Sequence, residues 1–236
     1  YGVLVGKKPL IFTNNDSGYE TAIEFKKNGV NPLILDTRKE PSSDIITEAK
    51  NLGIEIKYSY VVVAAKGYKK VKSADIAKIS DNKKDLSNIE NIECDCICVS
   101  GFWTPSIHLA SQSGNKSEFN EKIDAFIPKK SKQKENTIGS ANGKFTLEET
   151  INEAFNKGYE VSNKITENSN EVSIPTVVEK KSTEHDKFWC VPLPKGKSYK
   201  RFLDFQNDVA VTDIELALRE GFRSIEHVKR YTTLGM

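Results

Sequence analysis

The first third of the chain alternates between short apolar runs and stretches with the apolar spacing of a helix. Residues 9–13 and 31–36 are two apolar runs with the length of buried strands. Residues 17–28 lie between them and repeat apolar side chains at helical intervals, and Ser17 with Glu20 has the spacing of a capping box. Strand, helix and strand in this order predict a βαβ unit with parallel strands and a right-handed crossover. The expected buried face of the helix is Tyr19, Ala22, Ile23 and Phe25.

The same alternation continues to residue 100. Residues 43–52 again have helical spacing, and Gly53 is a typical helix stop. Three further strands are expected at residues 54–58, 61–66 and 69–79. A hairpin turn at 66–68 joins the last two of them, and residues 92–100 form a closing strand. Residues 1–100 are therefore predicted to be a Rossmann-like α/β domain of three layers, in which a parallel sheet carries an antiparallel meander.

Asp36 ends the second strand, about 20 residues beyond the first, where dinucleotide folds place the acid that binds a ribose. The preceding turn, residues 13–19, nevertheless lacks the Gly-x-Gly-x-x-Gly pattern because Gly18 is its one glycine. Asp16 in this turn would also repel a pyrophosphate. We interpret the domain as one whose own nucleotide site is degenerate, and we favour a solvated acid at a strand end over a ligand contact for Asp36.

Three of the four cysteines, Cys94, Cys96 and Cys98, alternate along the closing strand. A period of two places their thiols on one face of a strand, where the side chains point in parallel and do not converge on a metal. Small buried side chains are the favoured interpretation. No spacing resembles a disulfide framework, which predicts a cytoplasmic protein.

Residues 136–143 form a glycine-containing loop before another predicted helix. Ile138 is expected to end a short strand, and Gly139 and Gly143 would let a ligand approach the backbone. A helix N-terminus after such a loop offers free N–H groups and a positive dipole to a phosphate. The local sequence leaves an ordinary strand-to-helix turn open as the alternative.

The helix after this loop is predicted from a capping box of Thr146 with Glu149 and from a glycine stop at Gly158. Its expected buried face is Leu147, Ile151, Ala154 and Phe155. His108 precedes the loop without a carboxylate or nucleophile near it in sequence. We interpret it as a structural or interface histidine rather than a general base. A polar connector with a short strand at 173–179 is expected next.

Two short helices are predicted near the end of the chain. Thr212 with Glu215 forms a capping box for the first, Gly221 ends it, and Ser224 caps the second. Their expected apolar stripes are Ile214, Ala217 and Leu218, and then Ile225, Val228 and Tyr231. So small a helix pair needs other elements for its stability.

The sequence of this helix pair carries a family resemblance. Asp208-Val-x-x-x-Asp-Ile214, followed by Arg219-Glu-Gly-Phe-Arg-Ser-Ile-Glu-His-Val-Lys-Arg-Tyr-Thr-Thr-x-Gly-Met236, resembles the [2Fe-2S] module of the bacterioferritin-associated ferredoxin type. Asp204 and Gln206 stand where that module has its first two cluster cysteines, and no cysteine follows Cys190. Because such clusters need cysteine thiolates, we expect the scaffold without the cluster. This cluster-less version is similar to the alpha subunit of heterotetrameric sarcosine oxidase.

The resemblance extends over nearly the whole chain and implies a domain organisation. Residues 1–100 resemble the nucleotide domain inserted in pyridine nucleotide–disulfide oxidoreductases, and residues 101–159 resemble the returning part of their main dinucleotide-binding domain. Residues 160–199 are then a connector, and residues 200–236 a truncated, cluster-less helical module. We expect an internal fragment of a longer protein because the chain opens on Tyr1 and its only methionine is Met236.

The resemblance also implies cofactors and contact residues. In sarcosine oxidase alpha subunits the glycine loop helps to hold NAD, whose Gly-rich fingerprint would lie upstream of Tyr1, and Asn142 stands near the position of a family acid. The implied NAD residues are Gly139, Ser140, Asn142, Gly143, Phe145, Thr146 and Leu147. FMN would lie between the alpha and beta subunits, where the implied phosphate or interface residues are Lys229, Arg230, Thr232 and Thr233. No catalytic or metal-binding residue is implied in this part.

The function that the resemblance implies is that of an oxidoreductase acting on CH-NH donors. Beta, gamma and delta subunits would complete a complex that oxidises sarcosine to glycine, passes the one-carbon unit to tetrahydrofolate and forms hydrogen peroxide, with FAD in the beta subunit. The rivals are an alpha subunit of a related opine, proline or amine dehydrogenase and a non-catalytic assembly scaffold. Asp204 and Gln206 argue against the dehydrogenase, because most such relatives keep the cluster cysteines.

Charge and hydropathy exclude other partners. The net charge is +2, with 35 basic and 33 acidic residues, so no polyelectrolyte partner is predicted. The basic run at 129–134 has no interleaved aromatic residue and is interpreted as a solvated loop rather than a nucleic-acid site. No apolar run approaches the length of a membrane span.

Overall fold

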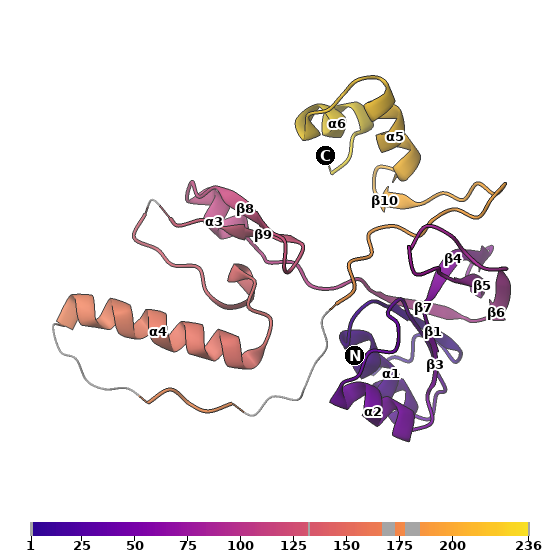
Figure 1. Cartoon of the computed structure of the whole chain (residues 1–236), viewed down its shortest axis with the longest axis horizontal. Coiled ribbons are helices and arrows are strands. Elements are labelled where there is room, and N and C mark those ends of the chain that lie inside the picture. The colour runs from indigo at the N-terminus through magenta and orange to yellow at the C-terminus, as the bar shows by residue number, and fades with distance from the viewer. Residues whose placement is uncertain (1, 132, 167–172, 178–184, 236) are drawn as a thin grey trace.

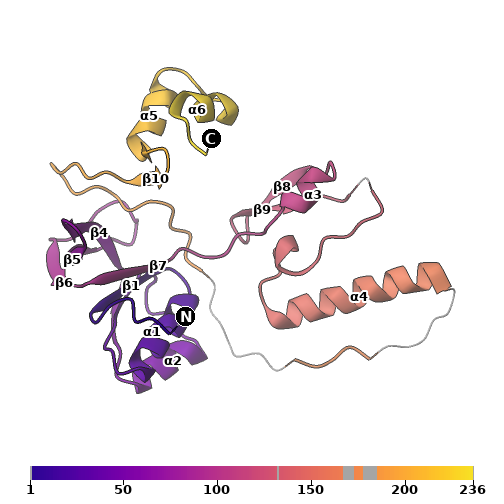
Figure 2. The ribbon, with the colours of Figure 1, turned by 180° about the vertical axis from the view of Figure 1, so that it is seen from behind.

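The computed structural model describes residues 2–131, 133–166, 173–177 and 185–235. An α/β unit contains the chain up to the end of strand β7 (Cys96–Ser100), and the segment after it leads to the long helix α4 (Figure 1). The pair of short helices α5 and α6 stands apart from α4 in both views of the molecule (Figure 2).

The α/β unit is built on a four-stranded parallel sheet with the strand order β3-β2-β1-β7. Its strands are β1 (Pro9–Thr13), β2 (Leu33–Asp36), β3 (Glu55–Tyr58) and β7 (Cys96–Ser100). The crossover helices are α1 (Ser17–Lys27) and α2 (Asp44–Asn51), and both cover the same face. Side chains from this face of the sheet and from the helices form one core cluster, namely Ile11, Tyr19, Ala22, Ile23, Ile34, Ile46, Ala49 and Ile54.

An antiparallel sheet with the order β4-β5-β6 covers the other face. Its strands are β4 (Tyr60–Gly67), β5 (Val71–Lys78) and β6 (Glu90–Glu93). A second core cluster joins the two sheets and consists of Leu10, Leu35, Ala74, Ile76 and Cys94. Alternation along the strands explains both clusters, because Leu10 and Ile11 point to opposite faces of β1. Helices, parallel sheet and meander are the three layers of the predicted α/β fold class, which is confirmed.

The predicted closing strand, residues 92–100, is two strands. β6 pairs with β5 and β7 pairs with β1, so the chain changes sheet at Cys94 and Asp95. The expectation that three thiols share one strand face was therefore wrong. Cys94 is buried between the sheets, whereas Cys96 and Cys98 are half-buried on β7 with their sulfur atoms 3.8 Å apart.

The Cys98 thiol is less acidic than an ordinary cysteine thiol. Burial and then the neighbouring Cys96 raise the pKa of Cys98 to about 11, so its thiol is protonated at neutral pH. In the part of the chain that the structure describes, no three His, Cys, Asp or Glu side chains come together as a metal site.

Helix α1 does not use the predicted capping box. Its N-cap is Asp16, and the Ser17 N–H and hydroxyl both donate to Asn15 Oδ1, at 2.9 and 2.6 Å. Ser17 therefore bonds Asn15 within the turn and does not form the predicted capping box with Glu20. The expected buried face is confirmed for Tyr19, Ala22 and Ile23, and Phe25 is half-buried.

The middle segment begins with α3 (His108–Gln112), which places His108 on the surface. A hairpin of β8 (Ser117–Asn120) and β9 (Ala125–Pro128) follows. The short 3₁₀ helix η1 (Gly139–Asn142) and α4 (Leu147–Thr166) complete the segment. Ile138 has an extended backbone but belongs to no strand, so the predicted strand before the loop was wrong.

The capped start of α4 at Thr146 is confirmed, because the Glu149 N–H donates to Thr146 Oγ1 at 3.2 Å. Two other predictions about this helix were wrong. The helix continues through Gly158 to Thr166. None of its residues, all of which the structure describes, is fully buried, and Leu147 is 57% exposed. The helix packs mainly on η1, which is too small to cover a whole apolar face. The predicted connector therefore begins as helix. Its predicted strand is coil at 173–177, and residues 178–179 lie outside the described part.

Gly158→Ala is expected to stabilise α4 by about 0.5–1 kcal/mol, because alanine loses less backbone entropy than glycine in a helix interior. A Cβ at this position would meet no atom within 4 Å, so no clash offsets the gain. Far-UV circular dichroism during thermal unfolding measures the change. An unchanged helical signal would show that the helix does not run through this residue.

The C-terminal module contains β10 (Phe202–Asp204), β11 (Val209–Ala210), α5 (Val211–Arg219) and α6 (Ile225–Thr232). Its helix α5 starts one residue before Thr212, and Asp213 rather than Glu215 accepts the N-terminal bond, from the Ala210 N–H at 2.8 Å. The predicted capping box was therefore wrong. Gly221 ends α5 with φ +93°, and Ser224 is the N-cap of α6, as predicted.

The apolar stripes of the two helices are narrower than predicted. Ala217 and Val228 are buried, and Ile214 is half-buried. Leu218, Ile225 and Tyr231 are exposed, because α5 and α6 cover each other only along one line. Among the described residues, no helix has both the length and the apolar character to cross a bilayer.

Candidate functional site

The carboxyl ends of β1, β2 and β7 form the edge at which open α/β sheets bind ligands. Asp36 lies at this edge with none of its surface exposed. Its carboxylate accepts hydrogen bonds from the Tyr19 hydroxyl at 2.6 Å and from the Arg38 guanidinium at 2.9 Å. The Arg38 backbone N–H donates to it as well, at 2.8 Å. Asp36 is therefore a buried structural acid, and both interpretations from the sequence were wrong.

Arg38 binds a second carboxylate on the other side of the turn. Its Nη1 lies 2.8 Å from Asp16 Oδ1, and the guanidinium is almost buried. Burial opposes the charged form of Arg38, but the hydrogen bonds and charges of Asp36 and then Asp16 outweigh it and raise its pKa. Burial, followed by the charge of Asp36, raises the pKa of Tyr19. An internal ionic network thus occupies the place where a ribose-binding acid would meet its ligand.

Side chains of the β1–α1 turn occupy the first donors of α1. The Asn15 carboxamide accepts from the Ser17 N–H and donates to the Ser100 carbonyl at 3.2 Å. The Ser17 and Ser100 hydroxyls lie 2.6 Å apart. Because the Ser17 N–H is satisfied by the chain itself, the turn lacks the open cradle that a pyrophosphate needs.

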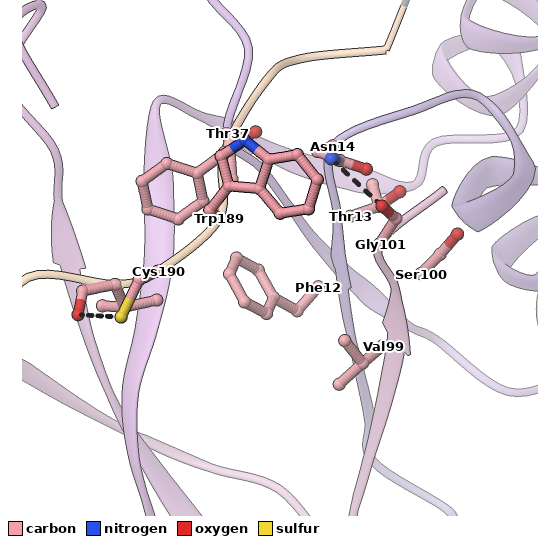
Figure 3. A pocket seen from close by; sticks show the side chains of 11 residues that line it. Phe12, Thr13, Asn14, Thr37, Val99, Ser100, Gly101, Trp189 and Cys190 are labelled. Atoms are coloured by element: carbon pink, nitrogen blue, oxygen red, sulfur yellow. Dashed lines mark hydrogen bonds between the residues drawn. The ribbon is translucent and has the colours of Figure 1, made fainter. Parts of the chain in front are cut away.

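A cavity of about 150 Å³ lies beside this turn (Figure 3). The ring of Trp189 faces that of Phe12 across it, and Asn14 lies at its rim. The remaining lining residues are Thr13, Thr37, Val99, Ser100, Gly101, Phe188, Cys190 and Val191. One wall is thus supplied by residues 188–191, which follow β7 by almost ninety positions in the sequence. No local sequence pattern predicts that residues 188–191 reach this edge of the sheet.

The glycine loop of the second predicted site is held by a carboxylate of α4. Glu153 Oε2 accepts from the Gly139 N–H at 2.7 Å, and Glu153 Oε1 accepts from the Asn142 carboxamide at 2.7 Å. Gly139 and Gly143 both have positive φ, +66° and +76°. Gly143 packs against Ile123, because a Cβ there would lie 2.6 Å from the Ile123 Cδ1 atom.

Of the other predicted NAD residues, Ser140 stays in the loop, and Phe145, Thr146 and Leu147 follow it. The ring of Phe145 packs edge-on against Phe102, with the centroids 5.4 Å apart. Thr146 bonds Glu149, and Leu147 points its side chain to the surface. Ser140 lies within η1. Glu153 is the residue that the sequence analysis missed, and its position two turns into a helix after a glycine loop was the available signal.

The four predicted FMN or interface residues divide into two pairs. Thr232 is buried, and its hydroxyl donates to the Val228 carbonyl at 2.8 Å, while the Thr233 hydroxyl donates to the Thr232 carbonyl at 2.6 Å. Lys229 is half-buried and Arg230 is exposed. Neither cation forms an ion pair with another residue that the structure describes. The cations are thus available to an anion, whereas both hydroxyls are occupied.

Asp204 ties two parts of the C-terminal module together. Its carboxylate accepts from the Asn207 carboxamide at 2.8 Å and from the Gly235 N–H at 3.0 Å. The Gln206 and Asn207 N–H groups add two more bonds, at 2.8 and 3.3 Å. We call this arrangement the Asp204 clasp. The hydrogen bond from Asn207 and then that from Gly235 lower the pKa of Asp204.

The Asp204 clasp is expected to open in acid. A carboxylate whose pKa is lower in the folded state stabilises that state above its unfolded pKa of about 4, and the contribution is lost as the pH falls through the folded value. The Gly235 amide resonance, followed by NMR during an acid titration, is expected to move with that transition. Asp204→Asn removes the charge and should abolish the transition. A transition that survives in this variant would assign it to another group.

Known proteins match both the C-terminal module and the chain as a whole. The family model of the sarcosine oxidase A3 domain matches residues 198–236. Sarcosine oxidase subunit alpha of Rhizobium meliloti (strain 1021) is 30% identical over 238 residues, which cover 100% of this chain and 23% of that protein. Sarcosine oxidase subunit alpha of Corynebacterium sp. (strain U-96) is 28% identical over 247 residues, covering 99% of this chain and 25% of that protein.

A solved structure that resembles the chain is L-proline dehydrogenase from P. horikoshii. It is 16% identical with a TM-score of 0.43, over 97% of this chain and 40% of that one. The chain spans about a quarter of the length of the curated relatives that it matches. Over its whole length, the chain is homologous to a part of the sarcosine oxidase alpha subunit, and its residues 198–236 match the A3 domain of that family.

Proposed function

We propose that this chain is part of the alpha subunit of a flavin-dependent complex that oxidises sarcosine. The observation that carries the proposal is the similarity to sarcosine oxidase alpha subunits along the entire chain, at up to 30% identity. In the proposed reaction, sarcosine, O₂ and water give glycine, formaldehyde and hydrogen peroxide, so the N-methyl carbon is oxidised by two electrons and O₂ is reduced by two. Tetrahydrofolate, where present, takes the one-carbon unit in place of water.

The described residues contribute support and contacts in this proposal, and we assign no catalytic residue to them. Beta, gamma and delta subunits complete the complex, with FAD in the beta subunit. The α/β unit is a scaffold, because an internal ionic network and the capped turn occupy its own nucleotide edge.

The glycine loop fits part of NAD but not its phosphates. Glu153 already binds the Gly139 N–H and the Asn142 carboxamide, and its negative charge would repel a pyrophosphate. Carboxylate and carboxamide oxygens accept hydrogen bonds from hydroxyl groups, so a ribose suits this loop better. We therefore propose a ribose contact for Asn142 and Glu153, with the phosphates held elsewhere in the full subunit.

The cations on α6 are the FMN-side contacts in this proposal. Lys229 and Arg230 lie in the last turn of the helix with no carboxylate partner among the described residues. Positively charged donors suit a phosphate or an acidic surface of a neighbouring subunit. Thr232 is excluded as a direct contact because its buried hydroxyl is already used.

The test is to produce the full-length protein together with its partner subunits and to measure oxygen uptake with sarcosine. Sarcosine-dependent uptake with equimolar hydrogen peroxide and formaldehyde is expected in the absence of folate. Oxidation of proline or an opine instead, with iron and sulfide in the complex, would identify the dehydrogenase rival. A complex without any amine oxidation would identify a scaffold.

Cofactor analysis of the same complex tests the proposed contacts. The FMN content is expected to fall on substitution of both cations, Lys229→Ala with Arg230→Ala. Arg223→Ala is the matched control, since Arg223 is exposed and lies outside α6. Asn142→Ala is expected to lower the NAD content with the FMN content unchanged. Unchanged cofactor contents in these variants would refute the contacts without affecting the assignment of the reaction.

A further inference from the structure

Residues 185–189 lie between the α/β unit and the middle segment, and their contacts alternate between the two. Figures 1 and 2 both show the chain after residue 184 passing beside the coil that leaves β7. The side chain of residue 186 bonds groups of the α/β unit, and the side chains of residues 185 and 187 contact residues that follow β7.

Asp186 attaches this segment to the α/β unit. Its N–H donates to the Asn14 carbonyl at 2.8 Å, and its own carbonyl accepts from the Asn14 carboxamide at 2.8 Å. The Asp186 carboxylate accepts from the Thr37 hydroxyl at 3.0 Å and from the Lys83 ammonium. These partners come from the ends of β1 and β2 and from the loop after β5, so the attachment spans the carboxyl edge of the parallel sheet.

His185 and Lys187 attach the segment to the middle part of the chain. The imidazole of His185 stacks on Phe102 with the ring centroids 3.7 Å apart and the planes 13° from parallel. Lys187 Nζ lies 3.2 Å from Asp124 Oδ1 and also donates to the Glu121 carbonyl. His185 Nε2 lies 3.9 Å from the other Asp124 oxygen.

The acidic partners of these ion pairs are more buried than in ordinary surface ion pairs. The side chains of Asp186 and Asp124 are 16% and 14% exposed and that of His185 is 9% exposed, whereas Lys83 and Lys187 are 37% and 52% exposed. Charges shielded from solvent are screened less by salt than exposed pairs are. The segment also carries Phe188 and Trp189 across the cavity beside Phe12, which adds apolar contact on the α/β side.

We propose that residues 185–189 form a latch that joins the α/β unit to the 101–128 segment. The first connection between these two parts is the covalent one, where β7 runs into residue 101. The latch supplies a second connection and fixes their relative arrangement. It also closes the carboxyl edge of the sheet, because Asp186 occupies the donors of Asn14 and Thr37. A ligand reaches this edge only after the latch is released.

The test is hydrogen–deuterium exchange of the full-length protein with Lys83→Ala, read at peptides remote from the substitution. Lys83 belongs to the α/β side, so a latch requires faster exchange in residues 119–128, on the opposite side, by about fivefold. Lys84→Ala is the matched control, since Lys84 is an exposed neighbour whose side chain makes no hydrogen bond or ion pair with another described residue. The control is expected to leave residues 119–128 unchanged.

The reciprocal substitution removes the other attachment. Asp124→Asn is expected to accelerate exchange at residues 36–39 in the α/β unit to a similar degree. Urea unfolding of each variant shows that the α/β unit remains folded. Acceleration confined to the substituted side in both variants would overturn the proposal, because the segment would then belong to one part alone.

Discussion

Arg38→Met is expected to lower the free energy of unfolding by about 3–5 kcal/mol, the usual loss when one partner of a buried ion pair is removed. Asp36 has no exposed surface, and Arg38 is the cation that neutralises it. Methionine fills a similar volume but leaves a carboxylate charge inside the protein. The desolvation cost of that charge far exceeds the value of a surface ion pair. Urea denaturation followed by circular dichroism measures the loss.

Lys39→Met is the matched control. Lys39 is the next residue in the chain, and its ion pair with Asp81, at 3.4 Å, is almost fully exposed. Its removal is expected to change stability by about 0.5 kcal/mol or less. Adding Asp36→Asn to Arg38→Met should restore part of the loss, because the double variant no longer buries an uncompensated charge. A loss below about 1 kcal/mol for Arg38→Met would contradict the network.

The elements of the α/β unit could be predicted because their signals are local. Apolar runs of strand length and helical repeats occur within single stretches of sequence, and the βαβ rule then gives the sheet its direction. The split between β6 and β7 could not be predicted in the same way. It depends on two different sheets that share one short stretch of sequence, residues 92–100, and this division is decided only in the assembled structure.

The role of Asp36 shows the same limit at the candidate site. Its position at the end of β2 was predicted, but its chemistry depends on Tyr19, which α1 brings to it from 17 residues away. The sequence Asp36-Thr-Arg38 did contain a usable signal, because a cation two residues after a buried acid can turn back onto it. The ligand edge is therefore better judged by its charge balance than by the acid alone.

The partner of the glycine loop was missed for a related reason. Glycines at a helix start suggested open donors, but Glu153, two turns into α4, accepts from the Gly139 N–H and the Asn142 carboxamide. Helix α4 continues past Gly158. A Cβ at this position would meet no atom within 4 Å, and the loss of helix propensity from one glycine is small in a helix of twenty residues. The latch was unpredictable, since it joins residues more than a hundred positions apart.

Gly18→Ala is expected to destabilise the protein by about 1–2 kcal/mol, even though alanine favours a helix over glycine by up to about 1 kcal/mol. Gly18 is the single glycine of the β1–α1 turn, and it serves packing. A Cβ there would lie 2.6 Å from the Cβ of Thr13, which is buried in β1. The helix must therefore move away from the sheet, and overpacking of about 1–3 kcal/mol outweighs the gain in propensity.

Gly101→Ala is the control for Gly18→Ala, because Gly101 is exposed and a Cβ there would meet no atom within 4 Å. It is expected to change stability by about 0.5 kcal/mol or less. Thr13→Ala combined with Gly18→Ala should cost less than the sum of the two, since removal of the threonine branches makes room. Urea unfolding of the four proteins measures this coupling. A stabilised Gly18→Ala variant would show that α1 can shift on the sheet without loss, and the turn glycine would then have to serve a ligand instead.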